Sequence, residues 1–251
     1  MVSERAILRT SWLGRVRYQP MYDLQRSLVE RRQSGAIPDT LLLLEHEPVF
    51  TLGRRADKSH VLLDEFTIAA RDAEVIETDR GGEATYHGPG QLVAYPIVSI
   101  RELKLGPVAY IRILEETTIQ LLRDYGINGH RVVGKSGVWV DGEPGHKPPK
   151  GENPTGRKMA AIGVRVSRGI AMHGIALNVS TDLDYYAQIV PCGMPNLDVT
   201  SMERESDSSL DIERIAKKWA EIFADVLFFE VVWNNVAGTP EIQSKLEPVS
   251  V

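Results

Sequence analysis

The pattern of apolar and polar positions predicts several short strands in the first hundred residues. TLLLLEHEPVFTLGRR at 40–55 contains two short apolar runs broken at Glu47-Pro48, which predicts two strands. QLVAYPIVSI at 91–100 predicts a third strand. Pro96 lies within it and has no N–H for a sheet ladder, so we expect an edge position or a bulge there.

Three more apolar runs predict strands in the second half of the chain. GVWVD at 137–141 is one of them. MAAIGVRV at 159–166 and MHGIALNVS at 172–180 are the other two, joined by a turn at 167–169.

Two segments carry the spacing of amphipathic helices. PVAYIRILEETTIQLLRDYG at 107–126 has apolar residues at three- and four-residue steps, with Pro107 suited to the first turn and Gly126 to the C-terminus. SLDIERIAKKWAEIFADVLF at 209–228 is the second, with either Ser209 or Asp211 as its N-cap.

The remaining segments predict the domain organisation. The stretch 141–158 is rich in proline and glycine and nearly free of apolar residues, which predicts a long loop that is functional or mobile. No composition break marks a boundary, so we expect one domain over 1–233 and a loosely packed tail at 234–251. Strands in runs, with helices between or after them, favour an α+β or mixed-sheet α/β fold.

Composition and charge exclude several classes. With 43% hydrophobic and 25% charged residues, the 251-residue chain has the composition of a globular protein. The net charge of −5 argues against nucleic-acid binding. A charged N-terminus, short apolar runs and a single cysteine predict a cytoplasmic protein without a membrane segment or internal disulfide. The interval 130–170 carries a local excess of positive charge, which is either a solvated surface or a docking patch for an acidic partner.

Four features are candidates for chemistry, and each has a structural alternative. RGGEATYHGPGQ at 80–91 could bring backbone N–H groups close to a ligand, or it could be a plain glycine turn. Lys158 could be a surface charge, and His173 a hydrogen-bonded structural residue. Cys192, the only cysteine, could be a nucleophile or a buried inert thiol. The histidines and the cysteine lack metal-ligand spacing, so no metal site is expected.

Five spaced blocks together resemble a known family. RGGEATYHGPGQLVAYP, GVWV, KMAAIGVRV, HGIALNVSTDL and PCG follow one another in the order of the octanoyltransferases of lipoate synthesis, and EHEPVFTLGR at 45–54 also matches. The resemblance covers roughly residues 40–205 and implies the mixed-sheet catalytic fold of the biotin and lipoate protein ligases. The long insertion at 142–157 departs from the spacing expected between GVWV and the lysine.

The resemblance implies a reaction and its residues. An octanoyl group leaves an acyl carrier protein, forms a thioester with Cys192 and passes to a lysine ε-amine, with Lys158 as the catalytic partner. The implied substrate-binding residues are Arg80, Gly81, Gly82, Glu83, Ala84, Thr85, Tyr86, His87, Ala161, Ile162, Gly163, His173, Gly174, Ile175 and Ala176. We expect Gly163 and Gly174 to leave room for the acyl chain.

The implied partners are octanoyl-acyl carrier protein as donor and, as acceptors, the lipoyl domains of 2-oxoacid dehydrogenases and the glycine cleavage H protein. A thioester is already activated, so neither ATP nor another cofactor is expected. The enzyme is expected to be a monomer. Three other hypotheses stay open: an ATP-dependent lipoate-type ligase, a non-catalytic acyl- or carrier-binding module, and a hydrolase that uses Cys192 with His87 or His173 as base.

Overall fold

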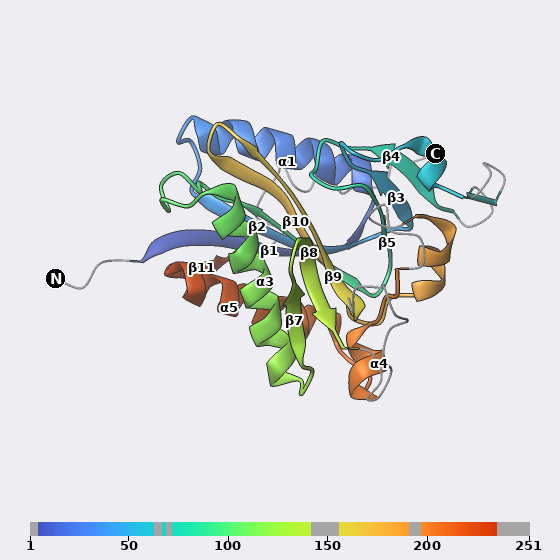
Figure 1. The fold of residues 1–251 in the computed structure, drawn as a ribbon. Helices are drawn as coiled ribbons and strands as arrows, with labels where there is room; N and C mark the ends of the chain where they lie inside the picture. The colour runs from blue at the N-terminus through green and yellow to red at the C-terminus, as the bar shows by residue number, and fades with distance from the viewer. Residues whose placement is uncertain (1–4, 63–66, 69–71, 142–155, 191–196, 235–251) are drawn as a thin grey trace.

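Two β-sheets organise the chain, and helices cover both faces of the larger one (Figure 1). The computed structural model describes residues 5–62, 67–68, 72–141, 156–190 and 197–234. The larger sheet has eight strands in the order β11-β1-β2-β6-β10-β9-β8-β7. The smaller has three, in the order β4-β3-β5. The predicted mixed-sheet α/β class is confirmed. In the large sheet β1 runs parallel to β2 and β11, whereas β2, β6, β10, β9, β8 and β7 each pair antiparallel with the next strand in that order.

The strands of the large sheet are β1 Ala6–Val16, β2 Asp39–His46, β6 Gln91–Ile97, β7 Gly129–Val132, β8 Lys135–Val140, β9 Arg157–Ser167, β10 Ile170–Asn178 and β11 Phe229–Trp233. Those of the small sheet are β3 Val49–Leu52, β4 Glu74–Glu77 and β5 Ala84–His87. The helices are α1 Tyr18–Gln33, α3 Pro107–Asp124, α4 Met202–Ser206 and α5 Ile212–Leu227, with 3₁₀ turns η1 Lys58–His60 and η2 Leu183–Gln188.

Strand β2 shows why the sheet is buried on both faces. Leu41 and Leu43 pack into the core beneath α3 and α5, whereas Leu42 and Leu44 pack into the core beneath α1. A strand covered on both sides needs apolar residues at every position, and this explains the unbroken run of leucines. In Figure 1, α1 lies on one side of the sheet and α3 and α5 lie on the other.

The predicted helices and most predicted strand positions are confirmed. Helix α3 begins with Pro107, and Gly126 follows its end with a positive φ of 73°. Helix α5 is capped by Asp211, whose side chain accepts hydrogen bonds from the backbone N–H groups of Glu213 and Arg214. Asp211, rather than Ser209, is therefore the cap.

The edge position predicted for Pro96 is wrong, because β6 lies inside the large sheet between β2 and β10. The ladder between β6 and β10 covers only Gln91–Ala94, and Pro96 is paired on the β2 side with Leu41. The proline therefore falls in the gap between the Ala94–Ile175 pair and the Ser99–Ile170 bridge, where its missing N–H interrupts no ladder bond.

Several elements were not predicted. Strand β1 and helix α1 form from the first 33 residues, and β5 occupies part of the glycine-rich stretch for which a plain turn was one of two alternatives. The predicted long loop is covered by the structure only at its two ends, since residues 142–155 lie outside the described part of the chain, as does the tail from 235 onward. None of the described helices is long and apolar enough to cross a membrane.

Candidate active site

A β-bulge in strand β9 determines which way Lys158 faces. Val138 of β8 pairs with Ala160, but the next residue, Trp139, pairs with Lys158, so Met159 is an extra residue in β9. Met159, like Ala160, is buried in the core beneath the helices. The extra residue reverses the in-and-out alternation, so Lys158 emerges on the opposite face of the sheet, together with Ala161.

Lys158 is held firmly at this position. Its backbone N–H donates to the carbonyl of Asp198 at 2.8 Å, and its carbonyl accepts from the N–H of Thr200 at 3.0 Å. The side chain is buried, with only 6% of the residue exposed, and Nζ lies 5.2 Å from the centre of the Trp139 ring. The reading of Lys158 as a solvated surface charge is therefore wrong.

Two adjoining cavities lie on this face of the sheet and share Thr85 and Ala161 as lining residues. The first is lined by Lys158, Met159, Ala160, Asn178, Tyr186, Leu197 and Val199 in addition. The second is lined by Tyr18, Arg80, His87, Tyr95, Gly163, His173, Gly174, Ile175 and Ala176 in addition. We refer to the two cavities together as the channel, which follows β9 from Lys158 to Gly163. Most of its lining residues are apolar or aromatic, which suits an apolar group.

Arg80 fastens the glycine-rich turn beside the channel. Its guanidinium is buried and donates to the carbonyl of Thr51 at 2.6 Å and to that of Glu83 at 2.7 Å. The N–H of Gly81 donates to the carbonyl of Val164 in β9 at 3.1 Å. The arginine thus binds the protein's own backbone and joins the turn to β3.

Gly163 and Gly174 allow close backbone packing. A Cβ on Gly163 would lie 2.7 Å from the carbonyl oxygen of Gly81, and one on Gly174 would lie 2.1 Å from that of Ala94. Both glycines line the channel, but backbone atoms already occupy the space of a side chain. Our expectation that they leave room for a ligand is corrected accordingly.

The far end of the channel carries buried histidines that are neutral at neutral pH. Burial lowers the pKa of His87 well below its usual range, with further lowering from His46 and Arg80. Burial lowers the pKa of His173 to about 3, assisted by Arg80 and Arg165. A general base works best with a pKa near the working pH, so these histidines are poor candidates for that role.

His173 has a structural partner instead. Its Nε2 lies 2.8 Å from Oδ1 of Asp79, which also pairs with Arg165. Its backbone N–H donates to Gln25 of α1, and its φ of 58° is in the left-handed region. These contacts hold β10 where its ladder with β6 ends, which supports the structural reading of this histidine.

The predicted substrate-binding residues divide into two groups. Nine of them line the channel: Arg80, Thr85, His87, Ala161, Gly163, His173, Gly174, Ile175 and Ala176. Six do not: Gly81, Gly82, Glu83, Ala84, Tyr86 and Ile162. The alternation of side chains along a strand explains three of the six. Ala84 and Tyr86 point into the apolar core that packs against the small sheet, and Ile162 points into the core beneath α3 and α5.

Cys192 lies outside the described residues, which exclude 191–196. The described chain resumes beside the lysine, since Leu197 lines the Lys158 cavity and Val199 forms a parallel bridge with Lys158. Tyr18, Tyr95 and Tyr186 are channel residues that the sequence analysis missed. Tyr18 begins an unpredicted helix, so only the structure could reveal its position.

Solved structures share this architecture. A protein from T. acidophilum, described as a lipoate protein ligase and solved with bound lipoic acid, matches with a TM-score of 0.69 at 15% identity, covering 97% of this chain and 93% of that one. Biotin protein ligase from Aquifex aeolicus matches with a TM-score of 0.52 at 13% identity, covering 87% of this chain and 70% of that one. The fold is that of a lipoate or biotin ligase catalytic domain, as expected.

Sequence relatives narrow the class further. Residues 17–224 match the lipoyl protein ligase A/B catalytic domain. An octanoyltransferase of Koribacter versatilis is 44% identical over 91% of this chain and 89% of its own length. Another, of Acidobacterium capsulatum, is 44% identical over 92% of this chain and 95% of its own length. The chain therefore belongs to the lipoyl protein ligase A/B catalytic domain family, and the predicted enzyme class, an acyltransferase, is confirmed.

Proposed function

We propose that this enzyme transfers an octanoyl group from octanoyl-acyl carrier protein to the ε-amine of a lysine on a lipoyl domain, through a thioester on Cys192. The observation that carries the proposal is the buried Lys158 in the lining of the channel. The octanoyltransferase relatives, which are 44% identical, identify the acyl group, and the T. acidophilum protein binds lipoic acid on the same fold.

In the first half-reaction, the Cys192 thiolate attacks the thioester carbonyl of the donor. The bond between the acyl carbon and the donor sulfur breaks, and the donor leaves as a free thiol after taking up a proton. A nearby ammonium stabilises a thiolate, so Lys158 activates Cys192 and can supply the proton to the departing sulfur.

In the second half-reaction, the acceptor amine must be neutral to attack the acyl-enzyme. It forms a carbon–nitrogen bond while the bond to the Cys192 sulfur breaks, and the amine proton is accepted by the thiolate or by neutral Lys158. The acyl chain lies in the channel along β9, between Lys158 and the Arg80 turn. Thioester-to-amide transfer proceeds without ATP.

The proposed acceptors are the lipoyl domains of 2-oxoacid dehydrogenases and the glycine cleavage H protein.

The basic interval at 130–170 offers less unpaired positive charge to an acidic donor than its formal charge implies. Arg131, Arg157 and Arg165 each pair with a carboxylate of the protein itself.

An ATP requirement separates the proposal from the ligase hypothesis. Wild type and Cys192→Ala are incubated with a lipoyl domain and either octanoyl-acyl carrier protein or free octanoate, each with and without ATP, and octanoylation of the domain is measured. The proposal predicts transfer by the wild type without ATP and none by the variant. Transfer that needs ATP and free octanoate and survives in Cys192→Ala would establish a ligase.

The same assay addresses the two other hypotheses. A non-catalytic binding module would leave the lipoyl domain unmodified under every condition. A hydrolase would release free octanoate at the same rate whether or not the domain is present.

A further inference from the structure

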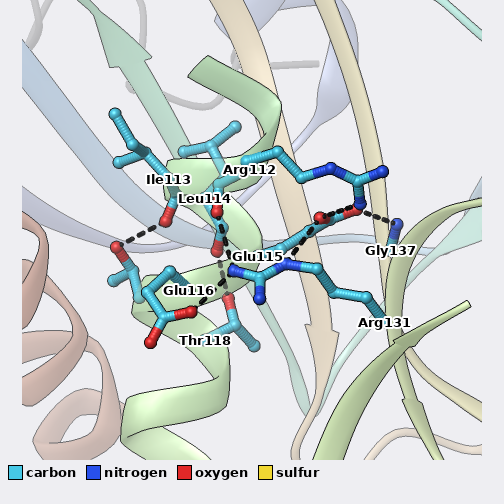
Figure 2. Close-up of polar contacts among 9 residues, drawn as sticks. Arg112, Ile113, Leu114, Glu115, Glu116, Thr118, Arg131 and Gly137 are labelled. Atoms are coloured by element: carbon cyan, nitrogen blue, oxygen red, sulfur yellow. Dashed lines mark hydrogen bonds and ion pairs between the residues drawn. The ribbon is translucent and has the colours of Figure 1, made fainter. Parts of the chain in front are cut away.

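A buried carboxylate lies outside the channel, on the face of the large sheet that α3 and α5 cover. Glu115 of α3 has no exposed surface. Its Oε2 accepts a hydrogen bond from Nη1 of Arg112 at 2.6 Å and from Nε of Arg131 at 3.1 Å. Arg131 also donates to Glu116 at 2.6 Å (Figure 2). A buried carboxylate is strongly unfavourable without such partners, so the two arginines are what allow Glu115 to remain charged at this position.

The second oxygen of Glu115 reaches the strand that carries the bulge. Oε1 accepts a hydrogen bond from the backbone N–H of Gly137 at 3.2 Å, and Figure 2 shows this contact on the side of the carboxylate facing β8. Gly137 precedes Val138, at which the pairing of β8 with β9 begins. The helix therefore supplies an acceptor for an N–H that lies just before that ladder.

Gly137 in turn lies against the side chain of Lys158. Its φ of 118° is accessible to glycine and strained for other residues. A Cβ at this position would lie 2.8 Å from Cε of Lys158 and 2.5 Å from the carbonyl oxygen of Ala160. The bare backbone of Gly137 is therefore part of the wall that confines the lysine stem.

We propose that Glu115 is a positioning residue for Lys158. Clamped by Arg112 and Arg131, it fixes Gly137, and Gly137 holds the lysine stem so that Nζ stays beside the Trp139 ring and faces the channel. Glu115 touches no substrate and acts only through the bulge. The inference rests on the proposed function for the catalytic importance of Lys158, but the placement of the lysine can be measured separately.

The first measurement is the amine reactivity of Lys158. An acylating reagent labels the intact enzyme, and peptide mass spectrometry gives the labelling of Lys158 relative to Lys217, whose side chain is 51% exposed. Glu115→Leu should raise this ratio by about fivefold or more, because a released lysine becomes accessible to the reagent, whereas only 6% of the wild-type residue is exposed. Glu115→Gln keeps an oxygen for Gly137 and should stay within about twofold of wild type.

Glu116→Gln is the matched control, since it also removes a carboxylate from Arg131 but leaves Gly137 untouched; its ratio should equal that of wild type. Thermal unfolding verifies that each variant is folded. If Glu115→Leu does not fold, Glu115→Met takes its place, because the flexible methionine side chain fills a similar volume without an oxygen for Gly137. A folded Glu115→Leu or Glu115→Met enzyme with the wild-type ratio would overturn the inference.

A second measurement separates the inference from the proposed function. The pH dependence of Cys192 alkylation is recorded for wild type, Lys158→Ala and Glu115→Leu. The inference predicts a thiol pKa raised in both variants. If the labelling ratio rises in Glu115→Leu but Lys158→Ala leaves the thiol pKa unchanged, Glu115 positions Lys158 and the proposed activation of Cys192 is wrong.

Discussion

At the scale of single residues, Lys158 combines burial with a location that its sequence context does not reveal. A lysine after a polar loop is usually solvated, yet this one is 6% exposed and lines a cavity. Two lysines lie near the same aromatic ring, since Nζ of Lys135 is 5.7 Å and Nζ of Lys158 is 5.2 Å from the centre of Trp139. Of these two lysines, Lys158 lines the channel and Lys135 does not.

This difference gives a paired test of catalysis. Lys158→Ala should lower the rate of octanoyl transfer by about 10²- to 10⁴-fold, the usual loss when a positioned acid–base group is removed. Lys135→Ala removes a charge near the same ring and should retain the wild-type rate. Equal loss in the two variants, measured by single-turnover transfer to a lipoyl domain, would show a general electrostatic effect in place of a specific role for Lys158.

The close packing at Gly163 predicts a loss of both stability and donor binding when a side chain is added there. In Gly163→Ala the new Cβ would lie 2.7 Å from the carbonyl oxygen of Gly81, so the turn must move away from β9. We expect a loss of about 1–3 kcal/mol in the free energy of unfolding, as for other overpacked sites, together with weaker binding of the acyl donor. Urea unfolding and KM for octanoyl-acyl carrier protein measure the two effects.

Gly106→Ala is the control for that change, since a Cβ there meets nothing within 4 Å. It should leave KM unchanged. A Gly163→Ala enzyme with the wild-type KM and unfolding free energy would mean that the glycine turn is not packed against β9 as described.

At the scale of elements, sequence reasoning located those segments that carry local signals. Helix α3 begins at the predicted Pro107, and α5 was expected from its spacing and its polar cap. Strand β5 was missed because Ala84–His87 follows two glycines and is only four residues long. The sequence of β9 by itself does not indicate the bulge at Met159, because a bulge is defined by how two strands pair, here β9 with β8.

The cap of α5 offers a direct test of local stability. Asp211→Ala removes the oxygen that accepts from the N–H groups of Glu213 and Arg214, and should lower the free energy of unfolding by about 1 kcal/mol. Ser209→Ala should lower it by much less, because Ser209 is not the cap. Chemical denaturation of both variants measures the difference, and an equal effect of the two would contradict the assignment.

At the scale of the whole molecule, tertiary contacts make the site. Lys158 lies on β9, Gly81 donates to β9 from the glycine turn, and Glu115 of α3 accepts from β8, so no local pattern could show that the three are linked through the sheet. The five spaced blocks predicted most of the channel residues because they mark the strands that line it. They could not show that Gly163 and Gly174 serve backbone packing, or that Ile162 points away from the channel.

The buried histidines make the stability of the whole fold depend on pH. Burial lowers the pKa of His46 to about 4 and that of His173 to about 3, both below the reference value near 6.5. The unfolded chain therefore binds more protons below pH 6.5, and stability is lost as the pH falls from there towards the folded pKa values. His46 should cost about 2 kcal/mol at pH 5 relative to pH 7.5, and His173 should cost less, because the carboxylate of Asp79 beside its Nε2 favours the protonated ring.

Urea unfolding at pH 7.5 and pH 5 measures this loss. His173→Asn should show a smaller difference between the two pH values than wild type does, because one of the titrating groups is absent. An identical difference in the variant would show that His173 is not held neutral in the folded protein.

The most direct test of the account is the intact-protein mass after mixing with octanoyl-acyl carrier protein in the absence of ATP. The account predicts one octanoyl adduct on the wild type, located on Cys192 by peptide mapping and lost on addition of a lipoyl domain, and no adduct on Cys192→Ala. A wild-type enzyme that modifies the lipoyl domain under these conditions without passing through an adduct, or an adduct that persists in Cys192→Ala, would contradict it.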